Sequence, residues 1–202
     1  MKLFLLGETF EFENKLNSYN EIFILIENKL ADKDVYFSHL KLDGKEIYND
    51  FEMYFNDQLN SINKVEVVVQ SIEQFTCGII SSIHEYLSHS LIEVNSTLDE
   101  FYQSPQEETW GKYLTFLDGI SMVHQGIMSI DRSKHQPKNW EEYLVLATSM
   151  QKEFISLEEA LKQNDPILVA DITNYEIIPI LKAIQKQAQL TLEEEVGDKG
   201  AN

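Results

Sequence analysis

Residues 72–102 have the sequence IEQFTCGIISSIHEYLSHSLIEVNSTLDEFY, whose apolar side chains recur in steps of three and four. With about 3.6 residues per turn, this spacing puts one continuous apolar stripe on a helix of about eight turns. We therefore predict a long amphipathic helix that forms the spine of a helical bundle. Its stripe consists of Ile72, Phe75, Ile79, Ile83, Leu87, Leu91, Val94, Leu98 and Phe101.

Three further helices are predicted after this spine from capping signals. They begin near the caps Ser104, Asn139 and Asp165, and a proline follows the first and the third of these caps. Pro179 interrupts the last helix because it cannot donate a hydrogen bond to the carbonyl of Tyr175. We therefore expect a kink in the last helix.

Strand signals dominate the first third of the chain. Gly7 and the pair Asp43-Gly44 are expected to form hairpin turns between strands of alternating polarity. Ser18 and Glu21 form a capping box that favours a helix, although residues 22–26, IFILI, would also suit a strand by β-propensity alone. The expected strands are residues 2–6, 9–12, 35–42, 47–48 and 65–69.

The passage Leu40–Ile47, LKLDGKEI, is similar to the strand-turn-strand around a Gly-Lys pair in ubiquitin-like β-grasp domains, and residues 51–69 resemble the rest of that fold. The resemblance implies a docking module. Conjugation is not expected, because Val69 leads almost directly into the predicted spine and no free diglycine tail follows it. Lys41 stands where the family's recognition patch has isoleucine, whereas Val68 matches that patch.

The sequence therefore predicts an α+β chain of three parts. A small ubiquitin-like β-grasp domain is expected over residues 1–70, and an antiparallel bundle of about four long helices over residues 71–192. A flexible acidic tail is expected over residues 193–202.

The charge of the chain restricts its partners. The chain has 34 acidic and 16 basic residues, for a formal net charge of −18, which would repel nucleic acid and anionic membranes. We therefore expect a protein partner, with a homodimer as another arrangement. One cysteine, Cys77, cannot form an internal disulfide, and the apolar start of the chain is too short for a signal peptide, so the cytoplasm is expected.

Motifs that carry chemistry are incomplete. His84-Glu85 and His89 resemble a zinc-binding helix, but a step of five residues turns the second histidine about 140° from the first. None of the eight glycines forms a phosphate-binding motif. We therefore expect no catalytic residue, no cofactor and no metal ligand.

The last predicted helix is apolar on two sides. Leu168, Ile172 and Tyr175 lie on one side, which is enough for packing within the bundle. We expect the second side to contact the β-grasp domain or a second copy of the chain, although a central helix buried wholly within its own bundle is an alternative. The candidate interaction face consists of Val169, Ile177, Ile180, Leu181 and Ile184.

These patterns predict a non-catalytic cytoplasmic protein-protein interaction or adaptor protein, with a chaperone-like role as a variant. The alternative is an enzyme or small-ligand-binding protein, with its site in the helical bundle or at the domain junction. Residues that could build such a site are His124, Asp171, Tyr175 and Glu176. A ligand-sized cavity lined by these residues would favour the alternative.

Overall fold

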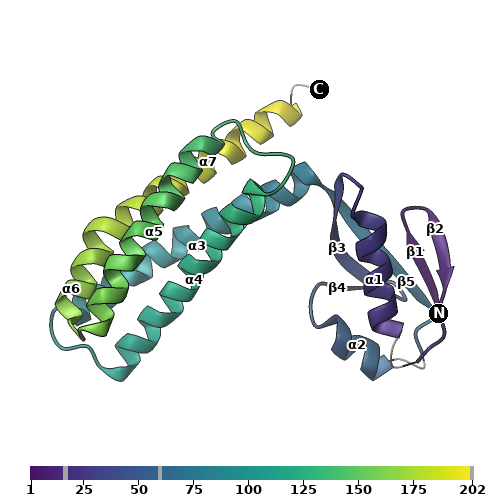
Figure 1. Cartoon of the computed structure of the whole chain (residues 1–202), viewed down its shortest axis with the longest axis horizontal. Helices are drawn as coiled ribbons and strands as arrows, with labels where there is room; N and C mark the ends of the chain where they lie inside the picture. The colour runs from purple at the N-terminus through teal and green to yellow at the C-terminus, as the bar shows by residue number, and fades with distance from the viewer. Residues whose placement is uncertain (16–17, 59–60, 201–202) are drawn as a thin grey trace. The chain divides into compact units, whose positions relative to one another are not determined.

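The computed structural model describes residues 1–15, 18–58 and 61–200, with side chains described as far as Glu194. The chain is α+β, since a mixed five-stranded sheet precedes a series of long helices (Figure 1). It divides into two compact units, Met1–Phe75 and a second unit that begins at Thr76. Each unit has its own hydrophobic core.

The sheet of the first unit has the strand order β2-β1-β5-β3-β4. β1 and β5 pair in parallel, and the other neighbours pair antiparallel. Alternate side chains point to one face of each strand, and helix α1 covers that face with Ile22 and Ile26. The elements of this unit are β1 (Lys2–Leu5), β2 (Glu8–Glu11), α1 (Ser18–Leu30), β3 (Val35–Leu42), β4 (Lys45–Ile47), α2 (Phe51–Gln58) and β5 (Lys64–Ser71).

Both predicted hairpin turns are present. Leu6 and Gly7 have φ of 50° and 81°, and Asp43 and Gly44 have φ of 49° and 90°. Two successive residues with positive φ give the backbone twist that two-residue hairpins prefer. The carboxylate of Asp43 also accepts hydrogen bonds from the backbone N–H groups of residues 63 and 64, which fixes the second turn against β5.

Residues 22–26 of the first unit are helical, as the capping signal predicts, although the Ser18 hydroxyl contacts Glu13 and Lys15 rather than Glu21.

The second unit is helical, and the predicted spine is its helix α3. The elements that follow β5 are α3 (Ile72–Phe101), α4 (Glu107–Asp131), α5 (Trp140–Lys162), α6 (Pro166–Asp171), η1 (Ile172–Ile177) and α7 (Ile178–Gly200).

The predicted helix caps differ in outcome. The carboxylate of Asp165 accepts a hydrogen bond from the backbone N–H of Leu168 at 3.0 Å, so that cap is confirmed. The cap of α4 is Gln106 rather than Ser104, because the hydroxyl of Thr109 accepts a hydrogen bond from the Gln106 backbone. Asn139 precedes α5 as predicted, but its side chain bonds α7 instead of capping α5.

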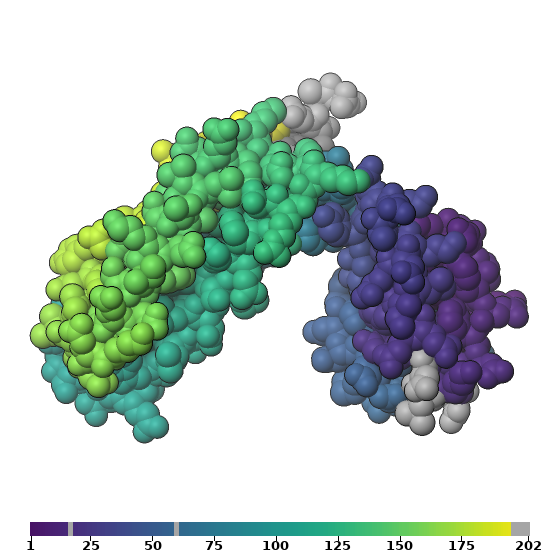
Figure 2. Space-filling model, viewed as in Figure 1, coloured from purple at the N-terminus to yellow at the C-terminus, as the bar shows by residue number. Residues whose placement is uncertain are grey.

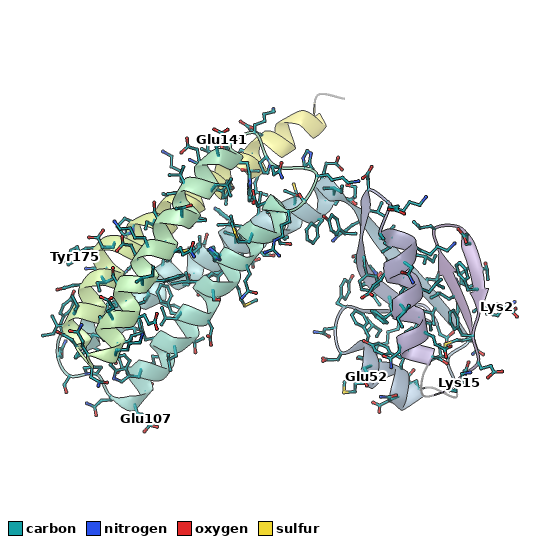
Figure 3. The ribbon with its side chains drawn as sticks, in the orientation of Figure 1. Lys2, Lys15, Glu52, Glu107, Glu141 and Tyr175 are labelled. Atoms are coloured by element: carbon teal, nitrogen blue, oxygen red, sulfur yellow. The ribbon has the colours of Figure 1, made fainter. Side chains whose placement is uncertain are left out.

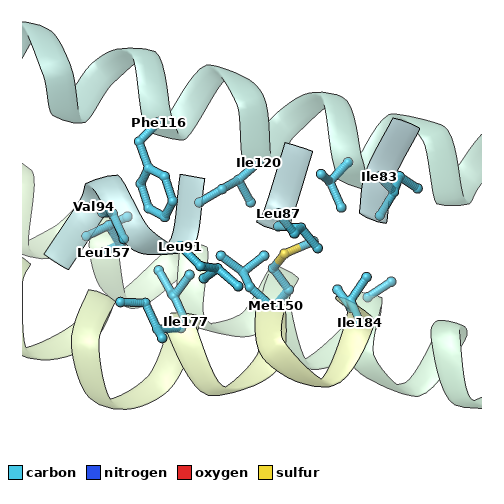
Figure 4. Packing of buried hydrophobic residues seen from close by; sticks show 14 of the residues in the cluster. Ile83, Leu87, Leu91, Val94, Phe116, Ile120, Met150, Leu157, Ile177 and Ile184 are labelled. Atoms are coloured by element: carbon cyan, nitrogen blue, oxygen red, sulfur yellow. The ribbon is translucent and has the colours of Figure 1, made fainter. Parts of the chain in front are cut away.

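One core holds the helices of the second unit together. The spine stripe from Ile83 to Phe101 is buried. Figure 4 shows Leu87 and Leu91 of α3 close to Met150 of α5 and to Ile177 of η1. Burial of such side chains stabilises the folded state by about 1.5–3 kcal/mol each.

Helix α7 continues to Gly200, past residue 193, where the flexible tail is expected to begin, and residues 201–202 lie outside the described part of the chain. Glutamate is a good helix former, and the side-chain amide of Gln189 donates to Glu193 at 2.8 Å, one turn further on. These interactions continue the helix past Leu192. Among the helices that the structure describes, none combines the length and the apolar composition of a membrane span.

Candidate functional site

The predicted interaction face is buried inside the second unit. Val169, Ile177, Leu181 and Ile184 are fully buried, and Ile180 is half-buried against the same core. The same segment and α7 also bury two small residues and one hydroxylated residue. These are Ala170, Ala188 and Thr173, and all three are fully buried. These residues thus lie in the core of their own unit, which corresponds to the alternative of a central helix.

The opposite side of the same segment is exposed instead. Tyr175 is 66% exposed, Leu168 is 37% exposed, and Ile167 beside it is also exposed. Of the three residues expected to pack inside, Leu168 and Tyr175 are exposed, whereas Ile172 is half-buried against the core. We name this group the Tyr175 surface. It consists of the exposed residues Tyr102, Ile167, Leu168 and Tyr175 and the half-buried Asp171.

A short π-helix positions this surface. Within η1 the backbone N–H of Ile178 donates to the carbonyl of Thr173, five residues earlier. Pro179 follows directly and cannot donate, so the interruption predicted from the sequence takes the form of a wider turn. The buried hydroxyl of Thr173 donates to the carbonyl of Val169 at 2.7 Å and contacts the Tyr113 hydroxyl at 2.6 Å.

Tyr102 joins the end of α3 to this segment. Its hydroxyl donates to the carboxylate of Asp171 at 2.7 Å. Burial raises the pKa of Tyr102 to about 12, and the hydrogen bond to Asp171 and the nearby Tyr175 act in the same direction. The phenol therefore keeps its proton near neutral pH and holds the Asp171 carboxylate in place. Figure 3 labels Tyr175 at the end of the helical unit, and Figure 2 shows the surface of that region in yellow-green.

The residues proposed for a catalytic or ligand site are only partly brought together. Asp171 and Tyr175 belong to the Tyr175 surface, and Glu176 is an exposed neighbour in η1. His124 lies eleven residues beyond Tyr113 on α4, about 16 Å further along the helix. Among the residues whose side chains are described, no group of three His, Cys, Asp or Glu could hold a metal ion. Tyr102 was missed, because the sequence gives no signal that pairs it with Asp171.

The sheet carries a second polar cluster on its outer face. Lys41 and Glu46 form an ion pair at 2.9 Å, and the Tyr48 hydroxyl donates to the same carboxylate at 2.8 Å. The hydrogen bonds from Lys41 and Tyr48 lower the pKa of Glu46. The hydrogen bond to Glu46 in turn raises the pKa of Lys41. An ion pair therefore occupies Lys41 on this face of the sheet.

Each of the two units matches the model of a described domain. Residues 1–71 match the model of the TP0873 N-terminal domain, and residues 78–187 match the model of a domain of unknown function (DUF8042). No curated protein and no solved structure matches the chain. Because the second match covers more than half of the chain, the chain belongs to the DUF8042 family.

Proposed function

We propose that the chain is a non-catalytic cytoplasmic interaction or adaptor protein, which binds a protein partner through the Tyr175 surface. The observation that carries the proposal is the exposure of Tyr175, Leu168 and Ile167 on one short segment. Exposed apolar groups that cluster in this way mark protein contacts, and tyrosine is enriched where contacts contribute most of the binding free energy.

The surface is rigid enough to bind without a large ordering cost. The hydrogen bond from Tyr102 to Asp171 fixes its outer edge, and the buried contact of Thr173 with Tyr113 fixes the segment beneath it. A tyrosine on a fixed backbone loses little conformational entropy on binding, since it has only two rotatable side-chain bonds. These contacts support a preformed docking site.

Charge favours one kind of partner. Asp171 lies within the surface, and the exposed residues Asp165 and Glu176 lie close to it in the chain. The whole chain carries a net charge of −18. Complementary charge accelerates association and excludes like-charged molecules. We propose a basic polypeptide segment with apolar side chains as the partner, and neither nucleic acid nor an anionic membrane. A chaperone-like role toward such a segment is a variant of the same proposal.

The finer architecture is part of this proposal. For residues 1–70 we propose a ubiquitin-like β-grasp domain, supported by the parallel pair β1 and β5 beside one covering helix. For residues 71–192 we propose an antiparallel bundle of about four long helices. One support is that Asn139, at the start of α5, bonds Gln187 in the middle of α7. The other is that Ser88 of α3 bonds Gln185 of α7, while Tyr102, just after α3, bonds Asp171 at the end of α6, as expected for helices that run in opposite directions.

The experiment is affinity capture from the native cell with the full chain and a variant that carries Leu168→Ser and Tyr175→Ser. The expected result is one stoichiometric partner that the variant loses, with binding of the purified partner weakened at least about tenfold. Met122→Ser on α4 is the matched control, because Met122 is equally apolar and exposed but lies outside the surface. Equal binding by the wild type and the double variant would contradict the proposal.

A further inference from the structure

A cavity of about 400 Å³ lies between α3 and α4 and is separate from the Tyr175 surface. Its walls are apolar at Val94 and Phe116, and the side chains of Tyr86, Ser90 and Glu93 also line it. Figure 4 shows Val94 and Phe116 on the facing helices. The volume is within the range of small-ligand sites, and a few polar groups on an apolar wall are typical of them.

Gly119 of α4 allows Tyr86 to lie against the helix backbone at the edge of this cavity. A Cβ at residue 119 would stand 2.0 Å from the Tyr86 hydroxyl oxygen, which no side chain could tolerate. The Tyr86 hydroxyl donates its one proton to the carbonyl of Phe116 at 3.1 Å. Its oxygen therefore remains available only as an acceptor.

Two other acceptors lie beside Tyr86. The hydroxyl of Ser90 is buried and has no hydrogen bond of normal geometry. Burial raises the pKa of Tyr86, and the nearby Ser90 hydroxyl counters part of that rise. The exposed side chain of Glu93 lines the same cavity as Tyr86, and its carboxylate adds to that rise. A buried hydroxyl without a partner costs free energy that a bound donor would recover.

The positive charge near the cavity is already neutralised. Lys112 also lines the cavity, but its ammonium pairs with Glu108 at 2.9 Å, one turn earlier on α4. The unneutralised charge at the mouth is the Glu93 carboxylate. A ligand with hydrogen-bond donors and a positive charge therefore fits better than an anion.

We infer that this cavity binds a small primary amine with an apolar body. An ammonium group has three N–H donors, which match the acceptors of Tyr86, Ser90 and Glu93. The apolar body would pack against Val94 and Phe116. This ligand class goes beyond protein docking and uses none of the residues of the Tyr175 surface.

The test is a titration of the full chain with 2-phenylethylamine, followed by NMR of the Val94 methyl groups, beside 2-phenylethanol as the uncharged ligand of equal shape. The expected result is saturable shifts with the amine and binding about tenfold weaker with the alcohol, because a charge-assisted hydrogen bond is lost. Equal affinity for both, or no saturable shift with the amine, would overturn the inference and leave a water-filled cavity.

Variants separate the site from the general attraction of a cation to an acidic protein. Glu93→Gln is expected to weaken amine binding about tenfold, and Ser90→Ala to weaken it less. Glu85→Gln is the matched control, since Glu85 is an exposed carboxylate on the same helix that does not line the cavity. If Glu85→Gln weakens binding as much as Glu93→Gln, the attraction is general and the site is wrong.

Discussion

Two helical segments with the pattern Trp-x-x-Tyr, one in α4 and one in α5, attach the last part of the chain to the rest of the second unit. The two attachments differ. Tyr113 of α4 contacts the hydroxyl of Thr173 at 2.6 Å, and Tyr143 of α5 contacts the hydroxyl of Thr191 at 3.0 Å. Both tyrosines are fully buried. The sequence shows the pattern twice, thirty residues apart, but it does not show that both copies reach the same helix.

The difference lies in what each threonine does next. Thr173 donates to the carbonyl of Val169 in α6, so the first attachment supports the Tyr175 surface. Thr191 contacts Asn139 and the carbonyl of Gln187, so the second attachment joins the middle of α7 to the start of α5. The contact between Tyr113 and Thr173 therefore stabilises both the fold and the Tyr175 surface. The contact between Tyr143 and Thr191 stabilises the fold alone.

The largest expected effect comes from removing either ring. Tyr113→Ala and Tyr143→Ala should each lower the free energy of unfolding by about 3–5 kcal/mol, because each leaves a cavity in a packed core. Chemical denaturation measures the loss. Tyr175→Ala is the control, since its exposed ring should change stability by at most about 0.5 kcal/mol. A loss below about 1 kcal/mol for either buried tyrosine would show that the core is not packed as described.

Alkaline pH should weaken both attachments. Burial raises the pKa of Tyr113 and of Tyr143 from 10.0 to about 12. The folded state thus retains protons that the unfolded state loses, so stability is complete below pH 10 and falls as the pH rises toward 12. The expected loss is about 3 kcal/mol per tyrosine. Unfolding at a series of pH values measures it, and Tyr143→Phe should remove its share of the slope. An unchanged slope in that variant would contradict the assignment.

The smallest effect separates the two attachments most directly. Tyr113→Phe should cost about 1 kcal/mol, because the phenol contacts Thr173 inside the core. Tyr143→Phe should cost about 0.5 kcal/mol, since its contact is longer and Thr191 keeps two other partners. Hydrogen exchange of the amides in η1 should accelerate in Tyr113→Phe and stay unchanged in Tyr143→Phe. Equal acceleration in both variants would remove the distinction.

Local signals allowed much of the fold to be predicted. The stripe of α3, the Asp43-Gly44 turn and the Asp165 cap depend on neighbours within a few residues, and all three are present. The cap of α4 is Gln106, two residues after the predicted Ser104, because the hydroxyl of Thr109 accepts a hydrogen bond from the Gln106 backbone.

The candidate site could not be predicted in the same way. Periodicity identified two apolar sides on the last helix, but it could not decide which side packs inward. That choice depends on Thr173, which a count of apolar residues treats as polar although it is fully buried. The bond between Tyr102 and Asp171 spans sixty-nine residues, so no local pattern contains it.

The π-helical turn sets the rotational phase of everything that follows it. A turn closed by bonds between residues five apart holds more residues than an α-helical turn, so each of its residues advances the chain by a smaller angle. Loss of a single residue within Ile172–Ile177, with the π-helical turn kept, would rotate α7 relative to α6 by the angle of that one residue. Leu181 and Ile184 would then turn away from the core, and Thr191 would no longer face Tyr143. The number of residues in this segment is therefore as constrained as their identity.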